Sequence, residues 1–392
     1  MKTALQRAVA TVPAEREGVG NTDPLRSWMA FLHPKVDSEP FSQIVMELKA
    51  QPELALFDGK MQVLANNASR VDYEGLASWL VFRALQAGVE RALDDLRRYV
   101  TESEFECYYI KALGGIEVEG LVPLGNDITL VPFSSVADGF QKRLCEYESL
   151  GPGSTPRPSA ALVQTLIHPR IHINPDETIP NSLTKMASSN HLEDARLCLT
   201  LVGPSGPAGF GSWFMAAEWV PCMFGSCSMY APAVELRGGR RRLENSEYER
   251  AREIHELFLH LDSDSQARLR VPLQRLNLAI RRYSIVDSAI DLRIAMEAAF
   301  LDDLKNDGEL SYRLRIRAAR LLETDEQKRR DLYATFGDIY ELCSKAVHTG
   351  KVLGNKGRDV NVLLQEGILR TSKAIELAIR RGGIDWTSVT LS

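Results

Sequence analysis

The sequence predicts an α+β N-terminal region with a mainly β portion, followed by an all-α helical bundle. Between residues 105 and 235, apolar residues gather in short β-branched and aromatic segments separated by Gly or Asn-Asp turns. From about residue 244 onward they recur at helical spacing to the end of the chain. This change of hydrophobic period places the expected boundary at the glycine and arginine run 238–242.

The first 104 residues are expected to form an N-terminal segment with one long helix over about 71–101. Prolines and glycines make the first 25 residues poor helix material. Leucines then recur at helical spacing from Leu76 to Leu96, with Gly88 as the single helix-breaking residue inside the pattern. The sequence leaves open whether this segment is continuous with the region that follows it.

Residues 105–237 are expected to form the β-rich domain. The predicted strands fall within 105–110, 116–121, 128–131, 162–173, 197–202 and 212–220. His168 and His172 would share one face of a strand, as two metal ligands do. Because no third ligand is evident, surface histidines are the preferred interpretation, and we expect neither a metal nor a cofactor.

Residues 244–392 are expected to form the helical domain. Its first helix begins at Asn245-Ser246-Glu247, which resembles a capped helix start. Further helical patterns cover about 264–283, 285–304, 309–323, 326–348 and 359–381. The basic run before them, Arg240 to Arg242, either grips phosphate or forms a solvated linker, and we favour the linker.

Composition narrows the class of protein. Of 392 residues, 44% are hydrophobic and 25% charged, which excludes a mostly disordered chain. The net charge is −5, yet from Arg240 onward 27 Lys and Arg residues face 24 Asp and Glu residues. Any contact with a polyanion such as RNA is therefore expected in the C-terminal part.

Cysteine usage and hydropathy indicate a cytoplasmic protein that does not enter the membrane. Six cysteines without metal-binding spacing are expected to be free thiols in a reducing compartment. The N-terminus lacks the apolar stretch of a signal peptide, and no run of about 20 apolar residues is present.

Glu297 falls inside the apolar face of its predicted helix, where an unpaired carboxylate would be costly. A later helix presents Arg313, Arg317 and Arg320 along one face. Glu297 is therefore either a catalytic acid or half of a structural ion pair between two helices. We favour the ion pair, with Arg317 as the partner of Glu297.

The helix over 326–348 carries the candidate catalytic residue. Gly350 is a natural helix stop, so His348 is expected at a helix C-terminus. A histidine in this position is either a helix cap or a catalytic group.

The segment Ile339 to Gly350 resembles the signature of the HEPN superfamily, in particular its Apea-like branch. Four further segments agree with that family in order and spacing: Leu276–Tyr283, Asp291–Leu301, Glu309–Leu322 and Ile384–Trp386. The resemblance covers about residues 244–388. It implies an all-α bundle that forms a homodimer and cleaves RNA without a metal, in bacterial phage-defence or toxin systems.

The family motif places an arginine and a polar residue a few positions before a histidine. In this sequence His348 and Ser344 match the motif, but Cys343 occupies the position of the arginine. A thiol cannot replace a guanidinium fork on a phosphate. Either activity is weak, or Lys345 or Lys351 substitutes for the arginine, or the domain is no longer a nuclease. A Cys343–His348 nucleophile pair is disfavoured, because the two side chains would point about 140° apart on a helix.

Two classes of function follow from the resemblance. The first is an RNA-cleaving effector in which His348 is the general acid and base and Ser344 assists it. The second is a catalytically inactive sensor or scaffold that binds RNA or a protein. In both, the N-terminal region would recognise a trigger or partner protein that the sequence does not identify.

Overall fold

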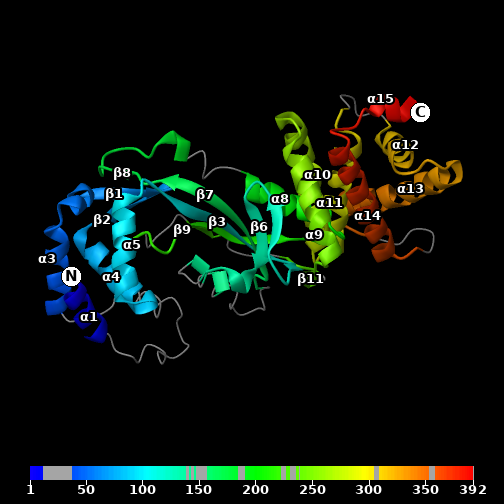
Figure 1. Cartoon of the computed structure of the whole chain (residues 1–392). Helices are drawn as coiled ribbons and strands as arrows, with labels where there is room; N and C mark the ends of the chain where they lie inside the picture. Colours follow the sequence, from blue (N-terminus) through cyan, green and yellow to red (C-terminus); the bar gives the residue numbers. More distant parts are fainter. Residues whose placement is uncertain are drawn as a thin grey trace.

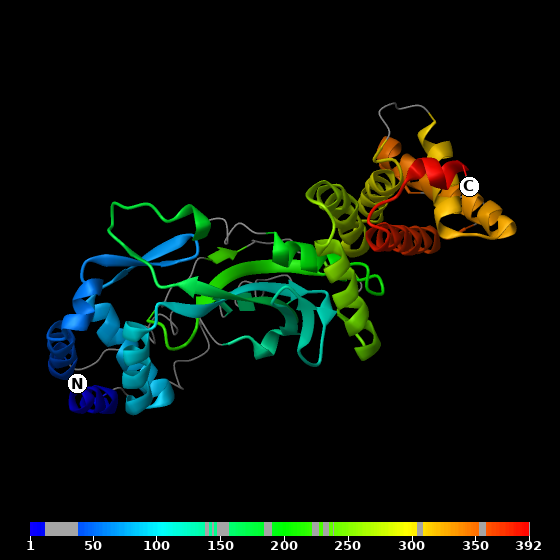
Figure 2. The ribbon, with the colours of Figure 1, turned by 45° about the horizontal axis from the view of Figure 1, so that its top comes forward.

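The fold is elongated, with N-terminal helices at one end, a β-sheet in the middle and a helical bundle at the other end (Figures 1 and 2). The computed structural model describes residues 1–11, 38–137, 141–142, 145–146, 157–183, 190–221, 227–229, 235–237, 239–303, 309–352 and 358–391. The predicted fold class, an α+β region followed by an all-α region, is confirmed.

In the described part of the chain, four α-helices and a small sheet form the N-terminal end. The helices are α1 (Lys2–Thr11), α3 (Ser38–Lys49), α4 (Tyr73–Ala87) and α5 (Val89–Thr101), with a 3-10 turn at Pro52–Phe57. The small antiparallel sheet has the order β2-β1-β8 and is formed by β1 (Lys60–Leu64), β2 (Asn67–Val71) and β8 (His172–Ile173). The predicted single helix over 71–101 is wrong, because Gly88 adopts φ 89° and divides it into α4 and α5.

An antiparallel sheet of order β10-β9-β3-β7-β6-β5 forms the middle of the molecule. Its strands are β3 (Glu104–Gly114), β5 (Val122–Gly125), β6 (Ile128–Pro132), β7 (Ala160–Pro169), β9 (Ala208–Ala216) and β10 (Cys227–Met229). Two short strands, β4 (Ile116–Glu117) and β11 (Arg241–Arg242), pair in parallel beside it, and a 3-10 turn covers Phe133–Ser135.

The predicted strand over 197–202 is wrong. Its first residues belong to helix α8 (His191–Leu199), and turns follow. The part of α8 that falls in the predicted strand, Leu197–Leu199, is apolar and buried, and the charged Asp194 and Arg196 before it are buried as well, so no polar face marks the helix. A short buried helix of this kind cannot be distinguished from a buried strand by periodicity.

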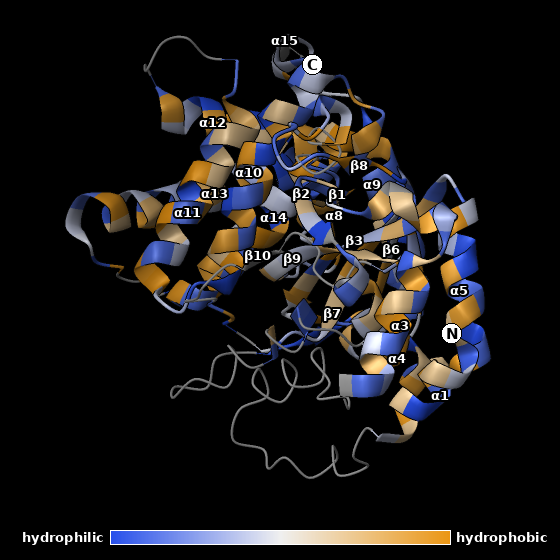
Figure 3. Ribbon diagram, turned by 90° about the vertical axis from the view of Figure 1, so that its left-hand side faces the viewer, coloured by the Kyte–Doolittle hydropathy of each residue, from blue (hydrophilic) through white to orange (hydrophobic). Residues whose placement is uncertain are grey.

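The C-terminal helices agree closely with the sequence patterns. They are α9 (Asn245–Leu259), α10 (Ser263–Arg281), α11 (Ile285–Phe300), α12 (Leu310–Leu322), α13 (Glu326–Thr349), α14 (Val360–Arg380) and α15 (Trp386–Leu391). Along α12 and α13, hydrophilic and hydrophobic residues alternate as in amphipathic helices (Figure 3). The apolar side of α13 buries Phe336, Ile339 and Cys343.

One hydrophobic core joins the sheet to the helical bundle. It runs from Leu124 and Leu130 in the sheet, through Leu199 of α8 and Phe258 of α9, to Phe300 of α11. Gly238, in the predicted boundary, lies outside the described residues. The division into a domain at 105–237 and a domain at 244–392 stays a prediction. The hydrophobic core contains residues from both ranges.

Candidate functional site

Helix α13 presents Tyr340, Ser344 and His348 at i, i+4 and i+8, which is one face of a helix. The helix ends where Gly350 adopts φ 63°, a left-handed conformation that glycine tolerates best. His348 is exposed and has no hydrogen-bond or ion-pair partner among the described residues. The predicted place of His348 at a helix C-terminus is confirmed, and its imidazole is accessible to a ligand.

Helix α11 packs against this face and contributes Arg293. The guanidinium nitrogen Nη2 lies 3.3 Å from the Tyr340 hydroxyl, and Nη1 lies 3.5 Å from Ser344 Oγ. The guanidinium also lies 5.1 Å from the centroid of the Tyr340 ring. The structure thus brings an arginine to the face that carries Ser344 and His348. The sequence analysis missed this residue.

Glu297 holds Arg293 and Tyr340 in place. Arg293 Nε donates to Glu297 Oε1 at 2.8 Å, and the Tyr340 hydroxyl donates to the same oxygen at 2.8 Å. Burial lowers the pKa of Arg293, but the hydrogen bond and charge of Glu297 outweigh it, and the net shift is upward. Burial, followed by the hydrogen bond to Glu297, raises the pKa of Tyr340. Arg293 is therefore charged, and the Tyr340 hydroxyl is neutral.

The predicted ion pair between Glu297 and Arg317 is wrong. Glu297 finds its partner one turn earlier on its own helix, and its side chain keeps 30% exposure at the edge of the apolar face. Arg317 instead bonds the Phe300 carbonyl at 2.8 Å, where α11 ends, and pairs with Asp303. The i, i+4 spacing of Arg293 and Glu297 was the sequence signal for the correct pair.

Cys343 is a core residue. Its side chain is fully buried, and burial raises the pKa of the thiol to about 12. The thiolate is the nucleophilic form of cysteine, so a neutral buried thiol does not act as a nucleophile at neutral pH. Cys343 supplies packing rather than charge at the position where the HEPN resemblance implies an arginine.

Lys345, the substitute suggested by the sequence, is engaged on the flank of α13. Its ammonium pairs with Glu341 at 2.7 Å, one turn earlier on the helix. The pair is about half exposed and therefore weak. Glu341 neutralises part of the Lys345 charge, whereas Arg293 already contacts Ser344.

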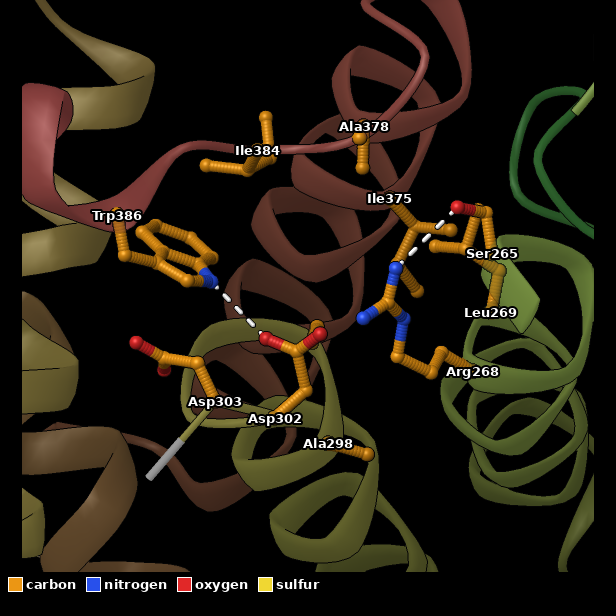
Figure 4. A pocket seen from close by; sticks show the side chains of 12 residues that line it. Ser265, Arg268, Leu269, Ala298, Asp302, Asp303, Ile375, Ala378, Ile384 and Trp386 are labelled. Carbon is orange, nitrogen blue, oxygen red and sulfur yellow. Dashed lines mark hydrogen bonds between the residues drawn. The ribbon is translucent and has the colours of Figure 1, made fainter. Parts of the chain in front are cut away.

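A small hollow lies in the bundle away from the Ser344–His348 face. It has a volume of about 120 Å³, and Arg268 and Asp302 line it (Figure 4). Asp302 accepts a hydrogen bond from Trp386 Nε1 at 2.9 Å, and Arg268 donates to Ser265 Oγ at 3.3 Å. None of its lining residues belongs to α13, so this hollow shares no residue with the Ser344–His348 face.

The interpretation of His168 and His172 as surface histidines of one strand is wrong, because His168 on β7 is fully buried and His172 lies on the separate strand β8. His168 Nε2 accepts the Ala65 N–H at 3.1 Å, and His172 Nε2 lies 2.8 Å from the Tyr99 hydroxyl. No group of three or more His, Cys, Asp or Glu side chains that suits a metal ion occurs among the described residues.

In comparison with known proteins, no family model, no curated protein and no solved structure matches this chain. In the described part of the chain, no helix has the length and apolar character needed to cross a bilayer.

Proposed function

We propose that this protein is a HEPN-like, metal-independent RNA endonuclease of a bacterial defence or toxin system, acting in the cytoplasm. The observation that carries the proposal is the Ser344–His348 face at the end of α13, with Arg293 against it. In RNA cleavage of this type, the ribose 2′-hydroxyl attacks the adjacent phosphate, and the 5′-oxygen of the next nucleotide leaves.

Each residue has a role in this reaction. His348 takes the proton from the attacking hydroxyl or returns one to the leaving oxygen. Arg293 provides the guanidinium that Cys343 cannot, and it stabilises the negative charge that develops on the phosphate. Ser344 offers a hydroxyl between them. As the family resemblance implies, a homodimer through the helical domain would bring two such faces together.

The direct test is incubation of the full-length protein with total RNA. His348→Ala is expected to abolish cleavage. His260→Ala is the matched control, since His260 is also an exposed histidine at a helix end, on α9. If His348→Ala cleaves RNA as fast as the wild type, His348 is only a helix cap and the proposal fails.

The buried Cys343 favours a second candidate, a catalytically inactive HEPN-like protein that binds RNA or a partner protein as a sensor or scaffold. For this candidate, RNA is retained but stays intact in the same incubation. Sedimentation at micromolar concentration tests the dimer, and a strict monomer would contradict it.

A further inference from the structure

Helices α12 and α13 enclose a groove of about 440 Å³ that reaches the candidate site. Arg315 of α12 lines one wall, and Gly337, Asp338, Glu341 and Ser344 of α13 line the other. Gly337 and Ser344 are separated by about 10 Å along the helix axis at 1.5 Å per residue. The groove therefore connects Arg315 to the residue that contacts Arg293.

Arg315 is held in place but keeps free hydrogen-bond donors. Its guanidinium lies 3.8 Å from the centroid of the Tyr333 ring, and its Nε donates to the Tyr333 carbonyl at 3.0 Å. Neither of its terminal nitrogens has a partner among the described residues. Gly337 allows this approach, since a Cβ there would lie 2.9 Å from Arg315 Cζ.

The carboxylates of the groove already have basic partners. Asp338 pairs with Arg358 at 3.4 Å, and Glu341 pairs with Lys345 at 2.7 Å. Arg315 has no carboxylate partner among the described residues, so once Asp338 and Glu341 are paired its positive charge is the one left without a partner in the groove. An anionic ligand complements it.

Two aromatic rings lie next to the groove, outside its lining: Tyr333 stacks on the Arg315 guanidinium, and Tyr312 packs against Tyr333. The centroids of Tyr312 and Tyr333 are 6.4 Å apart with an interplanar angle of 80°, and Tyr312 is 52% exposed. An exposed aromatic ring next to an arginine stacks on a nucleobase while the arginine binds phosphate. Only an unpaired base offers its face in this way, which selects single strands over duplexes.

We propose that this groove binds single-stranded RNA, with a phosphate on Arg315 and a base on Tyr312, and leads the strand to Ser344. This assignment rests on the proposed function, because it names how the same site takes its substrate. The two are nevertheless separable, since one concerns binding and the other concerns cleavage.

The test is fluorescence anisotropy of the full-length protein with a labelled single-stranded oligouridylate over a series of salt concentrations. The probe is 2′-O-methylated, which removes the attacking hydroxyl and prevents cleavage. Arg315→Ala is expected to weaken binding and to lower the slope of log affinity against log salt by about 0.7, the loss of one phosphate contact. Arg315→Lys should keep that slope.

Two further variants separate charge from shape. Tyr312→Ala should weaken binding roughly 5- to 150-fold, the effect expected when one base loses its stacking partner. The salt slope should not change, because no phosphate contact is lost. Gly337→Ala should weaken binding by displacing the guanidinium while keeping its charge. Arg330→Ala is the control, because Arg330 is an exposed arginine near the start of α13, paired with Glu326.

The outcomes distinguish the groove from the proposed function. An unchanged salt slope in Arg315→Ala, absence of binding, or equal affinity for a duplex of the same chemistry would overturn the groove. If Arg315→Ala binds the probe normally while His348-dependent cleavage is observed, the groove proposal is refuted and the proposed nuclease activity stands. If binding depends on Arg315 but unmodified RNA is not cleaved, the proposal that the groove binds RNA is supported and the proposed nuclease activity is refuted.

Discussion

Placing an arginine at position 343, where the HEPN resemblance implies one, is expected to destabilise the bundle rather than to activate the site. Cys343 is 0% exposed and lies in the core that joins α11, α13 and α14. An arginine there adds volume to a packed core, at about 1–3 kcal/mol. It also buries a guanidinium beside Arg293, whose charge already acts on the thiol, and this adds several kcal/mol. The free energy of unfolding should fall by at least about 4 kcal/mol.

Urea denaturation followed by far-UV circular dichroism measures this change. Cys343→Val is the matched control, because an apolar residue of similar volume should cost less than about 1.5 kcal/mol. If Cys343→Arg stays within about 1 kcal/mol of the wild type, the core has room for a guanidinium and the reasoning about Cys343 is wrong.

Two further predictions concern the N-terminal region. Gly115→Ala should destabilise the protein more than Gly59→Ala. Both glycines have positive φ, a conformation that costs an alanine about 1–2 kcal/mol. Only at Gly115 would a Cβ also approach a backbone atom, 2.8 Å from the Gly206 carbonyl oxygen. Equal urea midpoints for the two variants would contradict this. Burial, followed by the charges of Arg170 and Lys60, lowers the pKa of His172 from 6.5 to about 4. As the pH is lowered from 6.5 to about 4, the histidine is protonated in the unfolded chain before it is protonated in the folded protein, so the free energy of unfolding should fall. In urea titrations, His172→Gln should reduce this dependence of the free energy of unfolding on pH.

The sequence predicts the helical half well because its helix ends carry local signals. Gly350 ends α13 by its left-handed conformation, and Glu247 accepts the Glu244 N–H at 3.0 Å where α9 begins. Local signals failed where burial removes the pattern, as in α8. At Gly88 the local signal was present, but the sequence does not say whether a glycine inside a helical pattern is tolerated or, as between α4 and α5, ends the helix.

The candidate site shows the same limit. Ser344 and His348 share a helix, so their spacing alone places them on one face. Arg293 reaches Ser344 only through the packing of α11 against α13, and 51 residues separate the two in sequence. Glu297 was paired with the wrong arginine because the helical pattern placed it inside the apolar face, whereas packing leaves it at the edge.

The most direct test of the account is the single-turnover rate of RNA cleavage by the wild type, Arg293→Ala and His348→Ala, measured side by side. Removal of one charge-stabilising group should slow Arg293→Ala about 10²- to 10³-fold. His348→Ala should show no cleavage above background. Circular dichroism of both variants must match the wild type, so that the loss reflects chemistry rather than folding. If Arg293→Ala cleaves at the wild-type rate, or if the wild type cleaves no RNA, the proposed site is contradicted.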